Sequence, residues 1–110
     1  MRGDAGYMDL TSMMKQARRI QEQVQSLQDE LAHKTVEATA GAGMVRAVAN
    51  GRQELLSVRI APEVVSADDI GMLEDLVCAA VNEALRSARA LMQDEMTKIT
   101  GGIRIPGINA

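Results

Sequence analysis

The sequence contains one histidine, His33, and one cysteine, Cys78, which are the side chains best suited to nucleophilic chemistry. Such catalysis needs a nucleophile, a base and an orienting group that converge on one point. His33 falls at the expected C-terminal end of a helix, where the helix dipole favours a positive charge. Cys78, between Val77 and Ala79, is predicted to be a small core side chain. We therefore predict no catalytic residues and no enzymatic activity.

The acidic and glycine-rich segments lack the patterns that bind metals or phosphates. The carboxylates of Glu74-Asp75 and Asp94-Glu95 are adjacent in the sequence, so each pair diverges on a helix. Gly41-Ala42-Gly43 resembles part of a phosphate loop, but such a loop leads into a helix N-terminus, whereas this segment leads into a predicted strand. We expect a hairpin turn here, and we expect no metal, no cofactor and no small-molecule substrate.

Two clusters of basic residues remain as candidates for a functional site. Lys15, Arg18 and Arg19 have the i, i+3, i+4 spacing of one helix face, and Arg86 and Arg89 share a face of a later helix. Because the formal net charge is −3, contact with a polyanion would rely on these local clusters. With no Trp, no Phe and one Tyr, the chain is poorly suited to stacking on single-stranded bases. Spacing alone more often describes a solvated face, and any DNA contact would be to phosphates, with weak sequence preference.

Two long amphipathic helices are predicted to carry these clusters. The first has Asp9 as its N-cap, ends near His33 and shows a heptad pattern of apolar residues. The second follows a capping box formed by Ser66 and Asp69 and ends near Ile99. The apolar residues of the first helix are Leu10, Met13, Ala17, Ile20, Val24, Leu27 and Leu31. Those of the second are Ile70, Leu73, Val77, Ala80, Ala84, Ala88, Leu91 and Met96.

Three short strands are predicted between the helices, and they form an antiparallel sheet with one apolar face. Asn50-Gly51 is typical of a two-residue type I′ turn, which would place Ala47 opposite Glu54. The same turn would place Val45 opposite Leu56. The earlier connection needs an even number of residues, 40–43, and Pro62 ends the last strand. The residues of the predicted apolar face are Val36, Ala38, Val45, Ala47, Ala49, Leu56, Val58 and Ile60.

These elements fit one domain over residues 9–100, with a flexible leader at 1–8 and a mobile tail at 101–110. No run approaches the ~18 apolar residues of a membrane span, and the first eight residues lack the apolar core of a secretion signal. A single cysteine permits no intrachain disulfide, which fits a reducing compartment. We therefore expect a cytoplasmic protein with no membrane partner.

The predicted helices are too long for the predicted sheet. A helix of ~25 residues is about 38 Å long, whereas a strand of ~7 residues is about 23 Å long. The apolar stripes of the helices therefore extend past the sheet, and the sheet has two open edges. Self-association as a two-fold dimer would cover such surfaces, although the pattern does not show which surface pairs.

Several short segments share their order and spacing with one bacterial family, from about residue 10 to residue 107. They are Met14-Lys15-Gln16-Ala17, Gly41-Ala42-Gly43, Val45, Asn50-Gly51, Val58, Ile60, Pro62, residues 72–77, Ala79-Ala80, Asn82, Ala84, Gly102 and Pro106-Gly107. Together they resemble the YbaB/EbfC family of nucleoid-associated proteins. Two features depart from the family pattern: Ala49 replaces a larger aliphatic residue, and the short tail lacks an aromatic residue.

The resemblance implies an α+β fold of order α-β-β-β-α, with long terminal helices flanking a three-stranded antiparallel sheet in a tweezer-like homodimer. It also implies non-enzymatic binding of double-stranded DNA in the nucleoid, with roles in nucleoid organisation and gene expression. It supplies no DNA-contact motif. The choice of Lys15, Arg18, Arg19, Arg86 and Arg89 as DNA-binding residues therefore rests on charge and helix position.

The alternative is a homodimeric protein–protein adaptor that does not bind DNA. Residues 62–98 carry eight acidic and three basic residues, which suits a basic protein partner. The heptad pattern of the first helix could also receive a partner helix.

Overall fold

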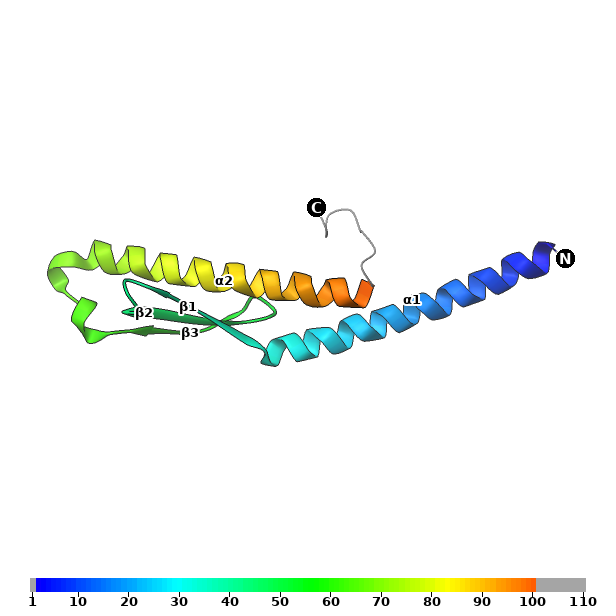
Figure 1. Cartoon of the computed structure of the whole chain (residues 1–110), viewed down its shortest axis with the longest axis horizontal. Helices are drawn as coiled ribbons and strands as arrows, with labels where there is room; N and C mark the ends of the chain where they lie inside the picture. The colour runs from blue at the N-terminus through cyan, green and yellow to red at the C-terminus, as the bar shows by residue number, and fades with distance from the viewer. Residues whose placement is uncertain (1, 101–110) are drawn as a thin grey trace.

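The computed structural model describes residues 2–100, which form two long helices and a three-stranded sheet (Figure 1). This α-β-β-β-α order confirms the predicted fold class. The tail predicted at 101–110 lies outside the described residues. The elements are α1 (Arg2–His33), β1 (Thr35–Ala40), β2 (Val45–Asn50), β3 (Leu55–Ile60), the short 3-10 helices η1 (Pro62–Val64) and η2 (Ala67–Asp69), and α2 (Ile70–Thr100).

The first hairpin has the even connection that the sequence predicted, displaced by one residue. Ala40 pairs with Val45, so the loop is 41–44 rather than 40–43. Val36 and Ala38 consequently lie on the same face as Ala49 and Ala47, their direct partners. Gly41 has φ +62°, and a Cβ on it would lie 3.0 Å from Leu76 Cδ2, so both backbone conformation and space favour glycine there.

The predicted register of the second hairpin is wrong. Val45 pairs with Ile60 rather than Leu56, and Ala47 pairs with Val58 rather than Glu54. The two-residue turn does not form because Gly51 N donates hydrogen bonds to Leu31 O and Lys34 O, both at 2.9 Å, which tie this segment to the end of α1. The loop therefore spans residues 51–54, and Gln53 has a positive φ of 63°.

The observed register differs from the predicted register by an even number of residues. β3 therefore presents the predicted side of the strand to the core. Val58 packs against the core as expected, but Ile60 and Leu56 remain 40% and 52% exposed. Ser57 pairs with Val48 and Leu55 with Ala49, so a bulge leaves Leu56 without a partner. The outer strand β3 is therefore the part of the sheet that the chain covers least.

The core is an alanine-rich contact between α2 and the sheet. Ala80, Ala84 and Ala88 recur every four residues along α2 and are fully buried. They pack on the sheet face that presents Ala38 and Ala47, which are also buried. Small side chains let the helix lie close to the sheet, but each buries little apolar area, so the core is thin.

Short caps join the sheet to α2. Ser66 Oγ accepts a hydrogen bond from Asp68 N at 3.2 Å, so Ser66 caps η2. Asp69 Oδ1 accepts from Met72 N at 3.3 Å, which is a cap of α2. The predicted capping box is therefore wrong: Asp69 reaches forward into α2 instead of back to Ser66.

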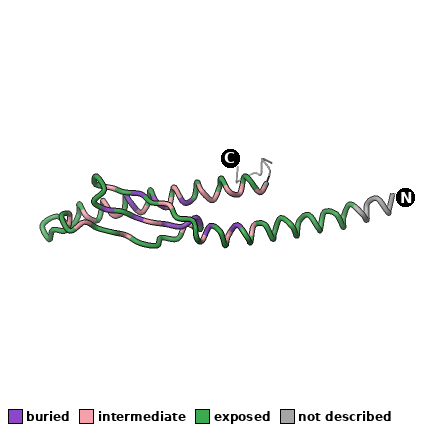
Figure 2. Tube along the Cα trace, turned by 60° about the horizontal axis from the view of Figure 1, so that its bottom comes forward, coloured by how far each residue is buried: buried purple, intermediate pink, exposed green. Residues whose placement is uncertain are grey.

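Helix α1 begins at Arg2, so Asp9 lies inside the helix and the predicted N-cap is wrong. Among the described residues, α1 packs against the sheet and α2 through its C-terminal end, where Leu27 and Leu31 are buried. Residues 9–23 are all exposed, and we call this segment the arm. Figure 2 shows the exposed segment of α1 that extends beyond the sheet and α2. The molecule spans 80 × 25 × 17 Å as a result.

Asn50 fixes the point at which α1 leaves the sheet. Its side chain is 3% exposed and donates hydrogen bonds to Ala32 O at 3.3 Å and Glu54 Oε1 at 2.8 Å. Its Oδ1 accepts hydrogen bonds from Arg52 N at 3.0 Å and Glu54 N at 3.1 Å. One buried amide thus connects the last turn of α1 to both ends of the β2–β3 loop.

No helix in the described part of the chain is long and apolar enough to cross a membrane.

Candidate nucleic-acid interface

The first predicted basic cluster lies on the arm. Lys15, Arg18 and Arg19 are exposed, and they make no ion pair or hydrogen bond with any other described residue. Helical spacing places them on the side of α1 opposite to Leu27 and Leu31, which face the chain's own core. Three unpaired cations on one solvent-facing side of a helix form a surface able to contact phosphates.

The second predicted cluster lies on α2, on the side turned away from the sheet. Arg86 and Arg89 are exposed, whereas Ala84 and Ala88 beside them are buried against the sheet. Arg86 forms an ion pair with Glu83 three residues earlier, which reduces its net charge toward a ligand. Arg89 has no partner among the described residues and is the freer of the two.

One chain does not bring the two clusters together. The arm, which carries Lys15, Arg18 and Arg19, runs past the end of α2 (Figure 1). Arg86 and Arg89 belong to α2, beside the buried Ala84 and Ala88 that pack on the sheet. Arg86 and Arg89 also face away from the core between α2 and the sheet, and the arm lies beyond that core. A single chain therefore offers two separate basic surfaces.

The outer face of the sheet carries two arginines that the sequence analysis did not single out. Arg46 and Arg59 are direct cross-strand partners on β2 and β3, and both are exposed. Arg46 Nε lies 3.1 Å from Glu37 Oε1, which offsets part of the repulsion between the like charges. These residues are distant in the sequence, so only the correct register could have revealed the pair.

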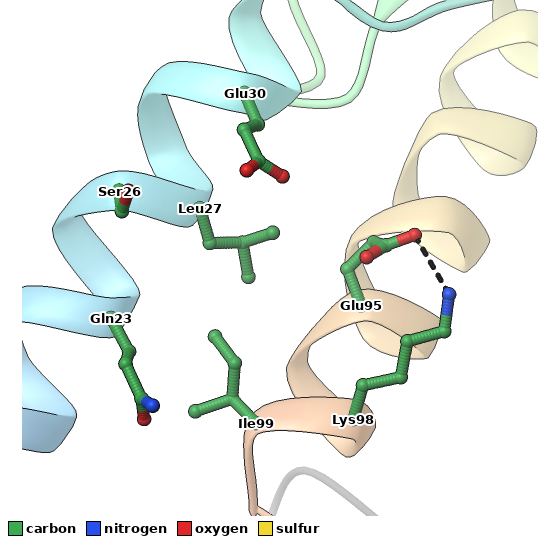
Figure 3. A pocket seen from close by; sticks show the side chains of 7 residues that line it. All are labelled: Gln23, Ser26, Leu27, Glu30, Glu95, Lys98 and Ile99. Carbon is green, nitrogen blue, oxygen red and sulfur yellow. Dashed lines mark hydrogen bonds and ion pairs between the residues drawn. The ribbon is translucent and has the colours of Figure 1, made fainter.

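A cleft opens where α1 and α2 diverge (Figure 3). Leu27 of α1 and Ile99 of α2 point toward each other across it, and its volume is about 370 Å³. Glu95 lies on its rim and accepts from Lys98 Nζ at 3.2 Å and Lys34 Nζ at 3.4 Å. The hydrogen bond from Lys98 lowers the pKa of Glu95; partial burial opposes this, and Lys34 adds to the lowering. The Lys34–Glu95 contact joins the end of α1 to the end of α2.

The two residues first considered for catalysis lie apart. His33 is exposed in the last turn of α1, at the helix C-terminus where the sequence placed it. The prediction that Cys78 fills the core is wrong, because its thiol is exposed on α2 while Ala80 takes the buried position. Within residues 9–99, no group of three His, Cys, Asp or Glu side chains is arranged to hold a metal ion.

Two long helices and a three-stranded antiparallel sheet define a small α+β protein, and its exposed basic arm is a surface able to contact phosphates. Residues 6–103 match the family model of the YbaB/EbfC DNA-binding family, and the chain belongs to this family.

Relatives with known names agree with this assignment. A nucleoid-associated protein of Thermoanaerobacter pseudethanolicus is 57% identical over 106 residues, which is 96% of each chain. A nucleoid-associated protein of Moorella thermoacetica is 51% identical over 102 residues, covering 93% of this chain and 98% of its own. A crystal structure of an uncharacterized protein from Helicobacter pylori has a TM-score of 0.73 at 16% identity, covering 81% of this chain and 94% of its own. That structure shares the fold.

Proposed function

We propose that this protein binds double-stranded DNA as a non-enzymatic homodimer in the bacterial nucleoid and thereby organises DNA and influences gene expression. The observation that carries the proposal is the unpaired basic side of the arm, formed by Lys15, Arg18 and Arg19, in a chain of the YbaB/EbfC DNA-binding family. The nucleoid location rests on the names of the relatives.

The composition supports contacts to phosphates rather than to bases. Long cationic side chains on a helix surface can neutralise phosphates, whereas the chain has one aromatic residue in all, so stacking contributes little. We therefore propose weak sequence preference. Arg86 and Arg89 form a second contact region, in which Arg86 must exchange Glu83 for a phosphate.

A homodimer would explain the separate basic clusters and the exposed apolar side chains of a single chain. The basic clusters of a single chain face different ways, and two-fold symmetry supplies each cluster twice. Exposed apolar side chains also lie on the arm and near β3, including Leu10 (57%), Met13 (64%) and Leu56 (52%). Such surfaces favour association with a second copy.

Salt-dependent binding tests the proposal. Fluorescence anisotropy with a duplex of a few helical turns should show log affinity falling with log salt, with a slope near −4 for a handful of phosphate contacts per dimer. Arg18→Gln/Arg19→Gln should reduce the magnitude of the slope by about 0.9 for each phosphate contact that is lost. Arg46→Gln/Arg59→Gln removes the same charge from the sheet and serves as the control.

Two results would contradict the proposed contacts. Equal losses in both double variants would mean that net charge, not the arm, governs binding. Absence of binding at low salt by a folded dimer would favour the protein adaptor, for which the exposed Glu74 and Asp75 of α2 offer an acidic surface. Recovery of partners from lysate after nuclease treatment would then identify a protein partner.

A further inference from the structure

Asn50 and Gly51 form the one Asn-Gly dipeptide of the sequence, and they lie at the junction where α1 leaves the sheet. Asparagine is a thermolabile residue, because a backbone nitrogen can attack its side-chain amide and displace ammonia. A following glycine favours this reaction, since it has no Cβ to hinder the approach of its nitrogen. The junction of α1 therefore contains the dipeptide that is best suited to spontaneous deamidation.

The fold requires both residues of this dipeptide. The side-chain amide of Asn50 donates hydrogen bonds to Ala32 O and Glu54 Oε1, and an ionised aspartate could donate neither. A Cβ on Gly51 would lie 2.5 Å from Leu31 Cδ2, so a larger residue does not fit there. The chain therefore keeps a labile dipeptide for structural reasons, and only its own packing can protect it.

The closed junction holds the reacting groups in other hydrogen bonds. Gly51 is buried, and its N–H is donated to Leu31 O and Lys34 O, both at 2.9 Å. The side chain of Asn50 is 3% exposed, and its Oδ1 accepts hydrogen bonds from two backbone N–H groups of the following loop. Attack of the Gly51 nitrogen on Asn50 Cγ requires the nitrogen to lose its proton and the side chain to leave these partners. The hydrogen bonds of the junction must therefore break before the reaction.

Helix α1 can open this junction without unfolding the core. In the described part of the chain its buried side chains, Leu27 and Leu31, are confined to its C-terminal end. The partly exposed ion pair between Lys34 and Glu95 adds little, because surface ion pairs are weak. Segments with few buried contacts open at a lower free-energy cost than the whole domain. Opening at this end frees the Asn50-Gly51 dipeptide while α2 stays packed on the sheet.

We propose that Asn50 is a site of spontaneous deamidation that is protected while α1 is docked and that, once modified, keeps α1 from docking again. In the open junction the Gly51 nitrogen loses its proton to solvent and bonds to Asn50 Cγ. The side-chain nitrogen leaves with a proton as ammonia. Water then opens the resulting succinimide ring, which gives an aspartate at position 50 or its iso-linked form. Water is the only co-reactant.

Neither product can restore the junction. An aspartate at position 50 would direct a carboxylate at Glu54 Oε1, which lies 2.8 Å from the amide nitrogen of Asn50, and two carboxylates at this distance repel each other. It would also leave Ala32 O without its donor. The iso-linked form adds one carbon to the backbone and displaces the Gly51 N–H from Leu31 O and Lys34 O. Because deamidation is irreversible, the modified chain keeps α1 detached.

Peptide mapping by mass spectrometry measures the reaction, through the small mass increase that replacement of an amide nitrogen by oxygen produces. Wild-type protein is incubated in mildly alkaline buffer, either folded or unfolded in guanidinium chloride. We expect Asn50 to react about tenfold or more slowly in the folded chain, because reaction requires opening. Asn82, which precedes Glu83, is the internal control and should stay intact. Equal rates in the two states, or no reaction of the unfolded chain, would overturn the inference.

Variants of the junction test whether its opening sets the rate. Leu31→Ala removes a fully buried contact of α1 and should accelerate deamidation of the folded chain by about tenfold, provided that circular dichroism shows a folded protein. Where Leu31→Ala unfolds the chain, Glu95→Gln decides, because it weakens only the ion pair with Lys34 and should accelerate deamidation by about twofold. Glu74→Gln removes an exposed carboxylate from the other end of α2 and is the matched control. A folded junction variant with the rate of this control would overturn the inference.

Asn50→Asp reproduces one product and tests its effect on α1. Amide hydrogen exchange of residues 27–33 should be about tenfold faster than in wild type. Asn82→Asp adds the same charge to the exposed side of α2 and should leave this exchange unchanged. Asn50→Asp/Glu54→Gln should recover part of the protection, because the new amide can donate to the new carboxylate. Equal exchange in Asn50→Asp and Asn82→Asp would overturn the inference. All these measurements are made without DNA, so they are independent of the proposed function.

Discussion

At the scale of single residues, Gly51 is needed for a reason other than the one that the sequence suggested. Asn50-Gly51 predicted a turn because such turns need positive φ. The structure needs glycine there for space: a Cβ on Gly51 would lie 2.5 Å from Leu31 Cδ2 and 3.1 Å from Leu31 O. Contact with α1 is a tertiary feature, and no pattern within the hairpin predicts it.

Gly51→Ala should destabilise the protein because the added methyl overlaps Leu31. We expect a loss of about 1–3 kcal/mol in the free energy of unfolding, the usual range for overpacking. A methyl group on Gly71, near the start of α2, would meet no atom within 4 Å, so Gly71→Ala should stabilise by about 0.5–1 kcal/mol. Urea denaturation of both variants measures the difference, and a neutral Gly51→Ala would refute the close contact.

The exposure of Cys78 could not be predicted from its immediate neighbours in the sequence. Its apolar neighbours Val77 and Ala79 suggested a buried thiol, yet only Val77 packs against the core. The buried stripe of α2 follows Ala80, Ala84 and Ala88, and Cys78 falls on the other side of the helix. Helical phase, rather than local hydropathy, sets its exposure.

At the scale of elements, periodicity predicted both helices, the three strands and the faces that they bury. It could not fix strand register, because a shift of two residues returns every side chain to the same face. The predicted pairs Val45–Leu56 and Ala47–Glu54 therefore satisfied the pattern as well as the observed pairs. The observed register is selected by the hydrogen bonds from Gly51 N to Leu31 O and Lys34 O at the end of α1.

The junction of α1 and α2 should weaken in acid. Hydrogen bonds from Lys98 and Lys34 lower the pKa of Glu95 below its usual value of 4.5. A carboxylate with a lowered folded-state pKa stabilises the folded protein above its unfolded-state pKa, and this contribution is lost as pH falls through the folded-state value. Thermal unfolding of wild type between pH 7 and about pH 3 should therefore show a decline that Glu95→Gln reduces.

Asp94→Asn provides the control for this effect. Asp94 is the neighbouring carboxylate and makes no ion pair with a described residue, so its removal should leave the pH dependence close to that of wild type. An identical pH dependence in wild type and Glu95→Gln would show that the two lysine contacts do not contribute to stability.

At the scale of the whole molecule, the chain is far more extended than its length requires. The Cα radius of gyration is 21.2 Å, compared with about 13 Å for a compact chain of this size. The sequence predicted helices that outrun the sheet, and it predicted the exposure of Lys15, Arg18 and Arg19. It could not predict that these residues and Arg86 and Arg89 face different ways, because that depends on how α1 and α2 diverge at the cleft.

The separation of arm and core leads to a prediction for a truncated chain. Residues 9–23 contribute no buried side chain, whereas Leu27 and Leu31 do, so a chain that begins at Glu22 retains the contacts of the core. We expect it to unfold cooperatively in urea, with a free energy of unfolding within about 0.5 kcal/mol of the full chain, as for changes at exposed positions. It should lose the steep salt dependence of DNA binding together with Lys15, Arg18 and Arg19. Loss of cooperative unfolding would mean that the arm stabilises the core after all, through contacts that a single chain does not make.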